Sequence, residues 1–129
     1  MAIQHSSTTR NRLRDGYVAA FPAGSSLVIR TGSPAGVGGA AGGSALATIT
    51  LPSTPLTSGT GQVTLNGSWT VSASGTGTAG HYRLTNGSDI EEGTVTATGG
   101  GGDLTLDNTS IASGQTVTVT SWTRTMPAA

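Results

Sequence analysis

The sequence contains no cysteine and no lysine, and it is poor in charge and in aromatic residues. Without cysteine the chain cannot form a disulfide, a thiolate metal site or a cysteine nucleophile. Only 9% of the 129 residues are charged and the formal net charge is zero, so the chain has little long-range attraction for anionic partners. The low charge therefore disfavours nucleic acid and membrane surfaces as partners.

Long apolar segments are missing as well. No stretch approaches the ~18 apolar residues that a transmembrane helix needs, and no early apolar run resembles the core of a signal peptide. We therefore expect a soluble, non-exported product. A chain of 129 residues normally makes one domain with one modest core.

One segment near the N-terminus has the pattern of a helix. Leu13, Tyr17 and Phe21 recur at four-residue spacing and form one apolar stripe. A serine at position 6 or 7 can cap the start of this helix, and Pro22 ends it. Gly16 disfavours the helix by about 1 kcal/mol relative to alanine. We assign residues 1–24 to an N-terminal helix or arm.

The remaining residues, 25–129, have the pattern of a β domain. Short alternating segments end at Gly, Asn or Ser, as strands do. The dipeptides that begin at Asn66 and Asn86 both predict turns, and the first predicts a hairpin between segments 62–65 and 68–74. The glycine-rich segment 32–44 predicts a long surface loop. The predicted fold is all-β, an antiparallel β-sandwich or jelly-roll-like barrel with a short N-terminal helix or arm.

The last predicted strand contains a tryptophan on an unexpected side. Strand alternation places Val117 and Val119 on one face and Trp122 on the other, together with threonines. A fully solvated face would not favour tryptophan. Either a partner surface or the edge of the core is therefore expected to cover Trp122.

The segment GTGTAG, Gly75 to Gly80, matches the G-x-G-x-x-G fingerprint of dinucleotide-binding proteins. That fingerprint binds pyrophosphate because a helix begins directly after it. Here the chain continues as HYRLTNGSD, which is short, aromatic and interrupted by Asn-Gly. We interpret the glycines as a flexible connection between strands and predict no cofactor.

The acidic residues and the histidines give no clear site. Loop carboxylates could bind calcium, but their spacing fits no EF-hand, and we interpret them as turn residues and solvated strand ends: Asp89, Glu91, Glu92, Asp103 and Asp107. His81 could pair with a serine, but no G-x-S-x-G occurs, and we interpret it as a strand histidine beside Tyr82. No catalytic or metal-binding residue is predicted, and we do not expect an enzyme.

Three arginines, Arg10, Arg12 and Arg14, form the one basic cluster of the sequence. Arg10 and Arg14 lie one helical turn apart and could bind phosphate or an acidic protein surface. The net charge is zero and no aromatic residues are interleaved, which favours a protein contact or a solvated helix face over nucleic acid. We predict Arg10, Arg12 and Arg14, with Tyr17 and Trp122, as protein-contact residues.

Several motifs together resemble one family. They are R-T-G-x-P at Arg30, A-G-x-[YF]-R at Ala79 and D-N-x-x-I-x-x-G-Q at Asp107, within a resemblance that covers approximately residues 26–125. In combination they resemble small structural proteins from the virion-assembly gene clusters of tailed double-stranded-DNA bacteriophages. The N-terminal helix belongs less clearly to this pattern.

The resemblance implies a β-rich, non-enzymatic part of a virion, made in the host bacterial cytoplasm and present in many copies. Capsid decoration or cement is the first expectation, with the major capsid protein or other virion proteins as partners and a homo-oligomer, preferably a trimer, as the assembly. A neck, tail or fibre protein is the alternative. A fibre protein could bind glycans or a host surface through Trp69, Tyr82 and Trp122. An enzyme that depends on His81 is the third hypothesis.

Overall fold

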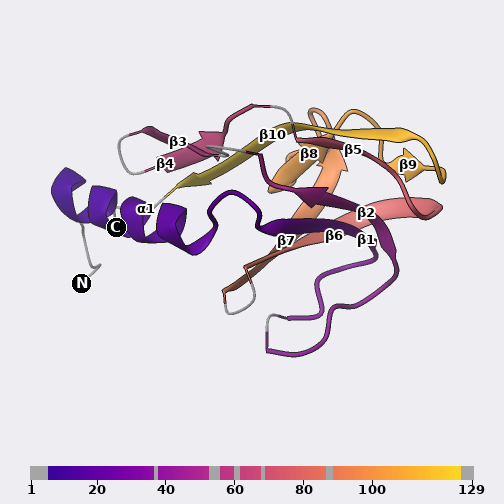
Figure 1. Ribbon diagram of the computed structural model, residues 1–129, viewed down its shortest axis with the longest axis horizontal. Coiled ribbons are helices and arrows are strands. Elements are labelled where there is room, and N and C mark those ends of the chain that lie inside the picture. Colours follow the sequence, from indigo (N-terminus) through magenta and orange to yellow (C-terminus); the bar gives the residue numbers. More distant parts are fainter. Residues whose placement is uncertain are drawn as a thin grey trace.

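In the computed structural model, which describes residues 6–36, 38–52, 56–59, 62–67, 69–86 and 89–125, the chain forms one helix followed by ten strands (Figure 1). The bounds are α1 Ser7–Ala20, β1 Ser26–Thr31, β2 Ala45–Thr50, β3 Leu56–Gly59, β4 Gln62–Leu65, β5 Thr70–Ser72, β6 Gly77–Thr85, β7 Ile90–Ala97, β8 Leu104–Leu106, β9 Ser110–Ile111 and β10 Thr116–Thr125. The predicted fold class, all-β with a short N-terminal helix, is confirmed. No described helix has the length and apolar character needed to cross a membrane.

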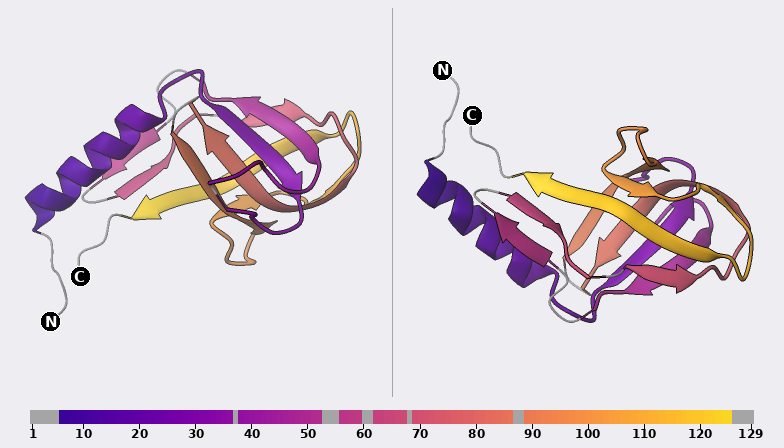
Figure 2. Two further views of the ribbon diagram at one scale, coloured as in Figure 1. Left: turned by 90° about the horizontal axis from the view of Figure 1, so that it is seen from below. Right: turned by 90° about the horizontal axis from the view of Figure 1, so that it is seen from above.

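The strands belong to one curled sheet in the order β2-β1-β6-β7-β8-β10-β4-β3 (Figure 2). Strand β5 pairs with the first residues of β10, whereas β4 pairs with its last residues. Strand β9 pairs with the start of β6. After β5, the amides of Ser74 and Gly75 both donate to Leu46 O in β2, at 2.9 and 3.1 Å. These bonds join the two sides of the curl, so the sheet comes close to a barrel.

One strand pair departs from the predicted antiparallel arrangement. Strands β7 and β8 are parallel, with Val95 opposite Leu104, although only residues 98–103 connect them. Parallel neighbours usually need a much longer crossover. Here glycines reverse the chain twice, because Gly99 and Gly101 have φ of 88° and 82°, which other residues rarely adopt. The four-glycine segment is therefore a compact double turn and not a simple break between strands.

The two Asn-Gly dipeptides have different outcomes. The second, for which a turn is predicted, begins at Asn86 between the paired strands β6 and β7, and Asn86 N donates to Asp89 O at 3.1 Å. The first does not form a hairpin, and this prediction is wrong. Strands β4 and β5 follow each other along the same edge of β10, and β4 pairs with β3 instead. Burial of Val63 and Trp69 inside the curl favours this path over local pairing.

Strand alternation assigns Trp122 to the wrong face of β10, and of the two covers expected for it, the core is the one that buries it, leaving Trp122 only 1% exposed. The pairing of β10 with β8 shifts register between Val119 and Ser121. One extra residue in a strand reverses the side-chain alternation that follows it. Val117, Val119 and Trp122 therefore all point into the core.

Helix α1 lies at one end of the curled sheet, beside the β3–β4 hairpin (Figures 1 and 2). Ser6 is its N-cap and accepts a hydrogen bond from Thr9 N at 3.2 Å, as one of the two predicted caps. The C-terminal half packs on the core through Tyr17 and Phe21. Leu13, one turn earlier on the same stripe, remains 42% exposed, so the stripe extends past the core.

Candidate functional site

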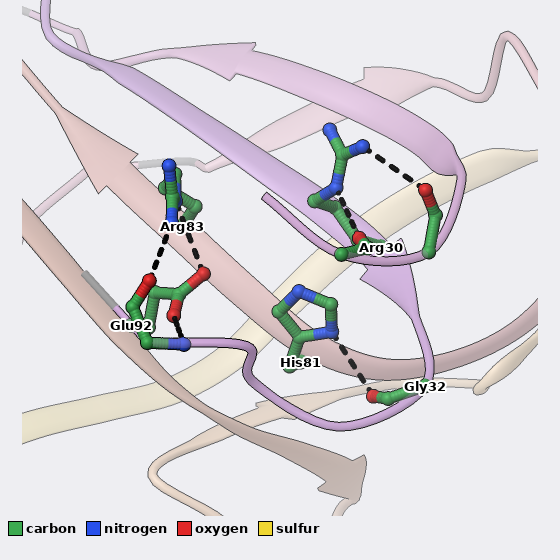
Figure 3. A network of polar contacts seen from close by, with 8 residues as sticks. Arg30, Gly32, His81, Arg83 and Glu92 are labelled. Carbon is green, nitrogen blue, oxygen red and sulfur yellow. Dashed lines mark hydrogen bonds and ion pairs between the residues drawn. The ribbon is translucent and has the colours of Figure 1, made fainter. Parts of the chain in front are cut away.

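The most extensive set of polar contacts holds the predicted loop on the outer face of β1, β6 and β7 (Figure 3). We call the described residues of segment 32–44 the strap. Arg30 binds the C-terminal end of the strap, donating from Nε to Gly42 O at 2.8 Å and from Nη2 to Gly43 O at 3.2 Å. The base is closed by Thr31 N, which donates to Ser44 O at 3.1 Å. The strap is a surface loop as predicted, but side chains of its own sheet fix its backbone.

A charged pair, Arg83 and Glu92, binds the strap at Gly36. Arg83 and Glu92 lie opposite each other on β6 and β7 and form an ion pair of 3.0 Å. The Glu92 carboxylate accepts from Gly36 N at 2.8 Å, and Arg83 Nη2 donates to Gly36 O at 3.0 Å. Both backbone groups of Gly36 are therefore bound by one ion pair.

The environment of Glu92 determines its charge. Its side chain is only 3% exposed, and this burial raises the pKa of the carboxyl. The hydrogen bond from Gly36, the hydrogen bond and charge of Arg83, and the nearby His81 outweigh burial and hold the pKa of Glu92 below its ordinary value. Glu92 is thus an anion in neutral solution, and our interpretation of it as a solvated strand end is wrong.

His81 lies under the base of the strap and is 0% exposed. Its Nδ1 is 3.0 Å from Gly32 O, and since a carbonyl only accepts, Nδ1 carries a proton. Its Nε2 has no hydrogen-bond partner among the described residues. No serine hydroxyl in that part of the chain bonds to the ring, so the described residues form no Ser–His pair. The contact it makes is structural: it binds the strap to β6.

The G-x-G-x-x-G fingerprint explains why the strap can lie so close. Gly77 to Gly80 are the first residues of β6 and not a flexible connection, and the strand continues where a dinucleotide site would need a helix. A Cβ on Gly80 would lie 2.3 Å from Gly32 O. The final glycine thus provides the space in which the strap crosses β6.

A second polar network connects α1 to the core. The Glu91 carboxylate accepts hydrogen bonds from Tyr17 Oη at 2.8 Å and Tyr82 Oη at 2.7 Å. Trp122 Nε1 donates to Tyr82 Oη at 3.2 Å, so that four side chains form one chain. The ring of Tyr17 also stacks on Trp122 with centroids 5.8 Å apart. This network holds the helix and leaves Glu91, which we expected to be a solvated strand end, between two tyrosines.

The five predicted contact residues do not form one surface. Tyr17 and Trp122 belong to the internal network just described. Arg14 binds Gly59 O at 2.7 Å and Asp15 at 2.7 Å, which ties α1 to the β3–β4 hairpin. Arg10 and Arg12 lie in the N-terminal half of α1, which we call its outer half, and Arg12 is exposed there. Trp122, which we predicted as a protein contact, is thus internal.

Two other groups of residues were considered from the sequence, the aromatic residues for sugar stacking and the acidic residues for calcium. The aromatic residues considered for sugar stacking are all buried, so their rings are not accessible to a glycan: Trp69, Tyr82 and Trp122. The described residues contain no group of three or more His, Asp or Glu side chains that could hold a metal ion. Asp103, one of the acidic residues considered, accepts instead from Thr94 N at 3.0 Å.

Sequence reasoning could have found the Arg83–Glu92 pair. The Asn-Gly turn fixes the register of β6 and β7, and counting outward from Asn86 and Asp89 places Arg83 opposite Glu92. No comparable signal identifies the bonds from Arg30 and His81, because their partners are backbone carbonyls of the strap. Compared with known proteins, no family model, curated sequence or solved structure matches this chain.

Proposed function

We propose that this protein is a structural component of a tailed-bacteriophage particle and decorates or cements the capsid through protein–protein contacts. The motifs that resemble such proteins motivate the proposal. Two of them meet in the fold: R-T-G-x-P leads into the strap, and A-G-x-[YF]-R supplies the His81 and Arg83 that bind it. Because these motifs form and hold a surface loop, they favour a contact function over a catalytic one.

The observation that carries the proposal is that charged and polar side chains near the core are used for internal contacts. Each binds backbone or another side chain at a fixed position: Arg30, His81, Arg83, Glu91, Glu92 and Asp103. A catalytic site needs polar groups that converge on an open position. The polar groups listed above hold loops and a helix in fixed positions. They therefore make the surface rigid, which suits a protein that acts by contact.

The strap supports the same function. Its exposed residues are small, and its backbone is bound in place before any partner arrives. A preorganised surface loses less conformational entropy on binding. Repeated over many copies on a shell, even a weak contact of this kind would contribute strongly to particle stability.

Co-sedimentation tests the proposal. The purified protein is mixed with empty capsids, and separately with isolated tails, of the phage that encodes it. We expect saturable binding to capsids at a stoichiometry set by the shell lattice. Binding only to tails would replace the capsid role by a neck, tail or fibre role, and binding to neither would overturn the proposal. Analytical ultracentrifugation of the free protein measures the proposed homo-oligomer, including the trimer.

A further inference from the structure

The Asn66-Gly67 dipeptide is a turn signal that the fold does not use for a hairpin. It lies between β4 and β5, and each of these strands pairs with β10 instead of with the other. Gly67 is exposed and has φ of 76°, in the left-handed region that favours glycine. The dipeptide therefore lies at the surface, in a turn whose flanking strands do not hold each other together.

The backbone amide of Gly67 is accessible to the side chain before it. Among the described residues no acceptor binds this amide, and glycine has no Cβ to shield it. An added Cβ would meet Pro52 Cγ at an ordinary distance of 3.7 Å and nothing closer. An asparagine that precedes such an amide can react with it, because the amide nitrogen can reach the side-chain carbonyl carbon and close a cyclic imide.

The same tripeptide, Asn-Gly-Ser, begins at Asn86 and provides an internal comparison. There the flanking strands β6 and β7 pair with each other up to the turn, and Asn86 N donates to Asp89 O at 3.1 Å. This pairing must open before the backbone of the turn can rotate. Asn108 is followed by a β-branched threonine, and its Oδ1 accepts a backbone hydrogen bond of 2.9 Å. Of these three asparagines, Asn66 is the one whose reaction the fold restrains least.

We propose that Asn66 is a self-modification site, at which asparagine converts to aspartate and isoaspartate without an enzyme. The Gly67 nitrogen bonds to Asn66 Cγ, the Cγ–Nδ2 bond breaks, and Nδ2 leaves as ammonia with the proton that the Gly67 amide gives up. Water then opens the cyclic imide. Breaking the new bond to Cγ gives aspartate, whereas breaking the original peptide bond gives isoaspartate, in which the chain runs through Cγ.

Isoaspartate at this position would act on the core through Trp69. The indole Nε1 donates to Asn66 O at 3.2 Å, and the side chain is only 1% exposed, with its ring centroid 5.6 Å from that of Trp122. In isoaspartate the accepting carbonyl becomes a free carboxylate, and an extra carbon enters the chain between β4 and β5. We expect Trp69 to shift. Either product also adds a negative charge to a chain of zero net charge. The reaction therefore ages the protein at a defined position, whatever its role in a particle.

Peptide mass spectrometry tests the reaction. The purified protein is kept at neutral pH, folded and in urea, and exchange of NH2 for OH is followed at Asn66 and Asn86. In urea the two tripeptides should react at similar rates. In the folded protein Asn66 should react at least about fivefold faster, the factor expected when a hydrogen bond must first break at Asn86. Equal rates in the folded protein, a faster reaction at Asn86, or no reaction at Asn66 would overturn the proposal.

Tryptophan fluorescence tests the effect on Trp69. The measurement uses Asn86→Gln, which silences the second tripeptide because glutamine would have to close a larger ring. The spectrum of this protein should change as product accumulates at Asn66, and adding Asn66→Gln should abolish the change. Asn66→Asp adds the charge without lengthening the chain and should keep the spectrum of the fresh protein. If the aged protein matches Asn66→Asp, isoaspartate does not move Trp69 and this part of the inference is wrong.

Discussion

The strap and the outer half of α1 are surface segments of the same molecule that are stabilised in opposite ways. The strap consists of glycines and residues with small side chains, yet Arg30, His81 and the Arg83–Glu92 pair bind its backbone. The outer half of α1 has large side chains, yet Leu13 is 42% exposed and the space around Gly16 is open. A glycine-rich loop can therefore be fixed by its neighbours, while a well-patterned helix can present a surface that its own fold does not complete.

The largest effect is expected where the strap crosses β6. In Gly80→Ala the new Cβ would lie 2.3 Å from Gly32 O and 3.0 Å from its carbonyl carbon and nitrogen, which are backbone atoms. The strap or the strand must move, and we expect a loss of roughly 3 kcal/mol in urea unfolding. Gly38→Ala is the control, because its Cβ meets nothing within 4 Å, and equal losses in both variants would disprove a close crossing.

A somewhat smaller loss of unfolding free energy is expected when the ion pair that binds Gly36 is broken. Arg83→Met leaves a carboxylate that is 3% exposed without its cation, although the bond from Gly36 N remains, and we expect the free energy of unfolding to fall by about 2 kcal/mol. Arg14→Met tests the helix in the same assay. Its ion-pair partner Asp15 is 64% exposed, so the loss should come mainly from the hydrogen bond to Gly59 O and amount to about 1 kcal/mol. Similar losses at both sites would show that the strap pair is not specially coupled to the fold.

Acid should weaken the hold of Glu92 on the strap. The folded pKa of Glu92 is lowered below its unfolded value, so the carboxylate stabilises the fold above the ordinary glutamate pKa. This contribution is lost as pH falls from the ordinary glutamate pKa through the lowered one. Urea midpoints measured from pH 7 to pH 2 should therefore fall more steeply for the wild type than for Glu92→Gln. Parallel curves for the two proteins would rule out this linkage.

The same comparison shows which features the sequence could predict. Alternating segments and turn residues identify eight of the strands and the helix, because these signals are local. The strap contacts could not be predicted, since they depend on backbone carbonyls brought over β6 by the tertiary fold. Trp122 was misplaced for a similar reason. The register shift after Val119 that turns it into the core leaves no signal in the alternating pattern of β10.

The smallest expected effect is a gain, and it tests whether the helix surface around Gly16 is open in the free protein. Gly16→Ala adds a methyl group where nothing lies within 4 Å, and alanine favours the helix by up to about 1 kcal/mol. The urea midpoint should rise, and Ala19→Gly, an exposed change in the opposite direction on the same helix, should lower it by a similar amount. A loss in Gly16→Ala would mean that a group already packs against Gly16 in the isolated protein. The outer half of α1 would then be completed by its own fold, as the strap is.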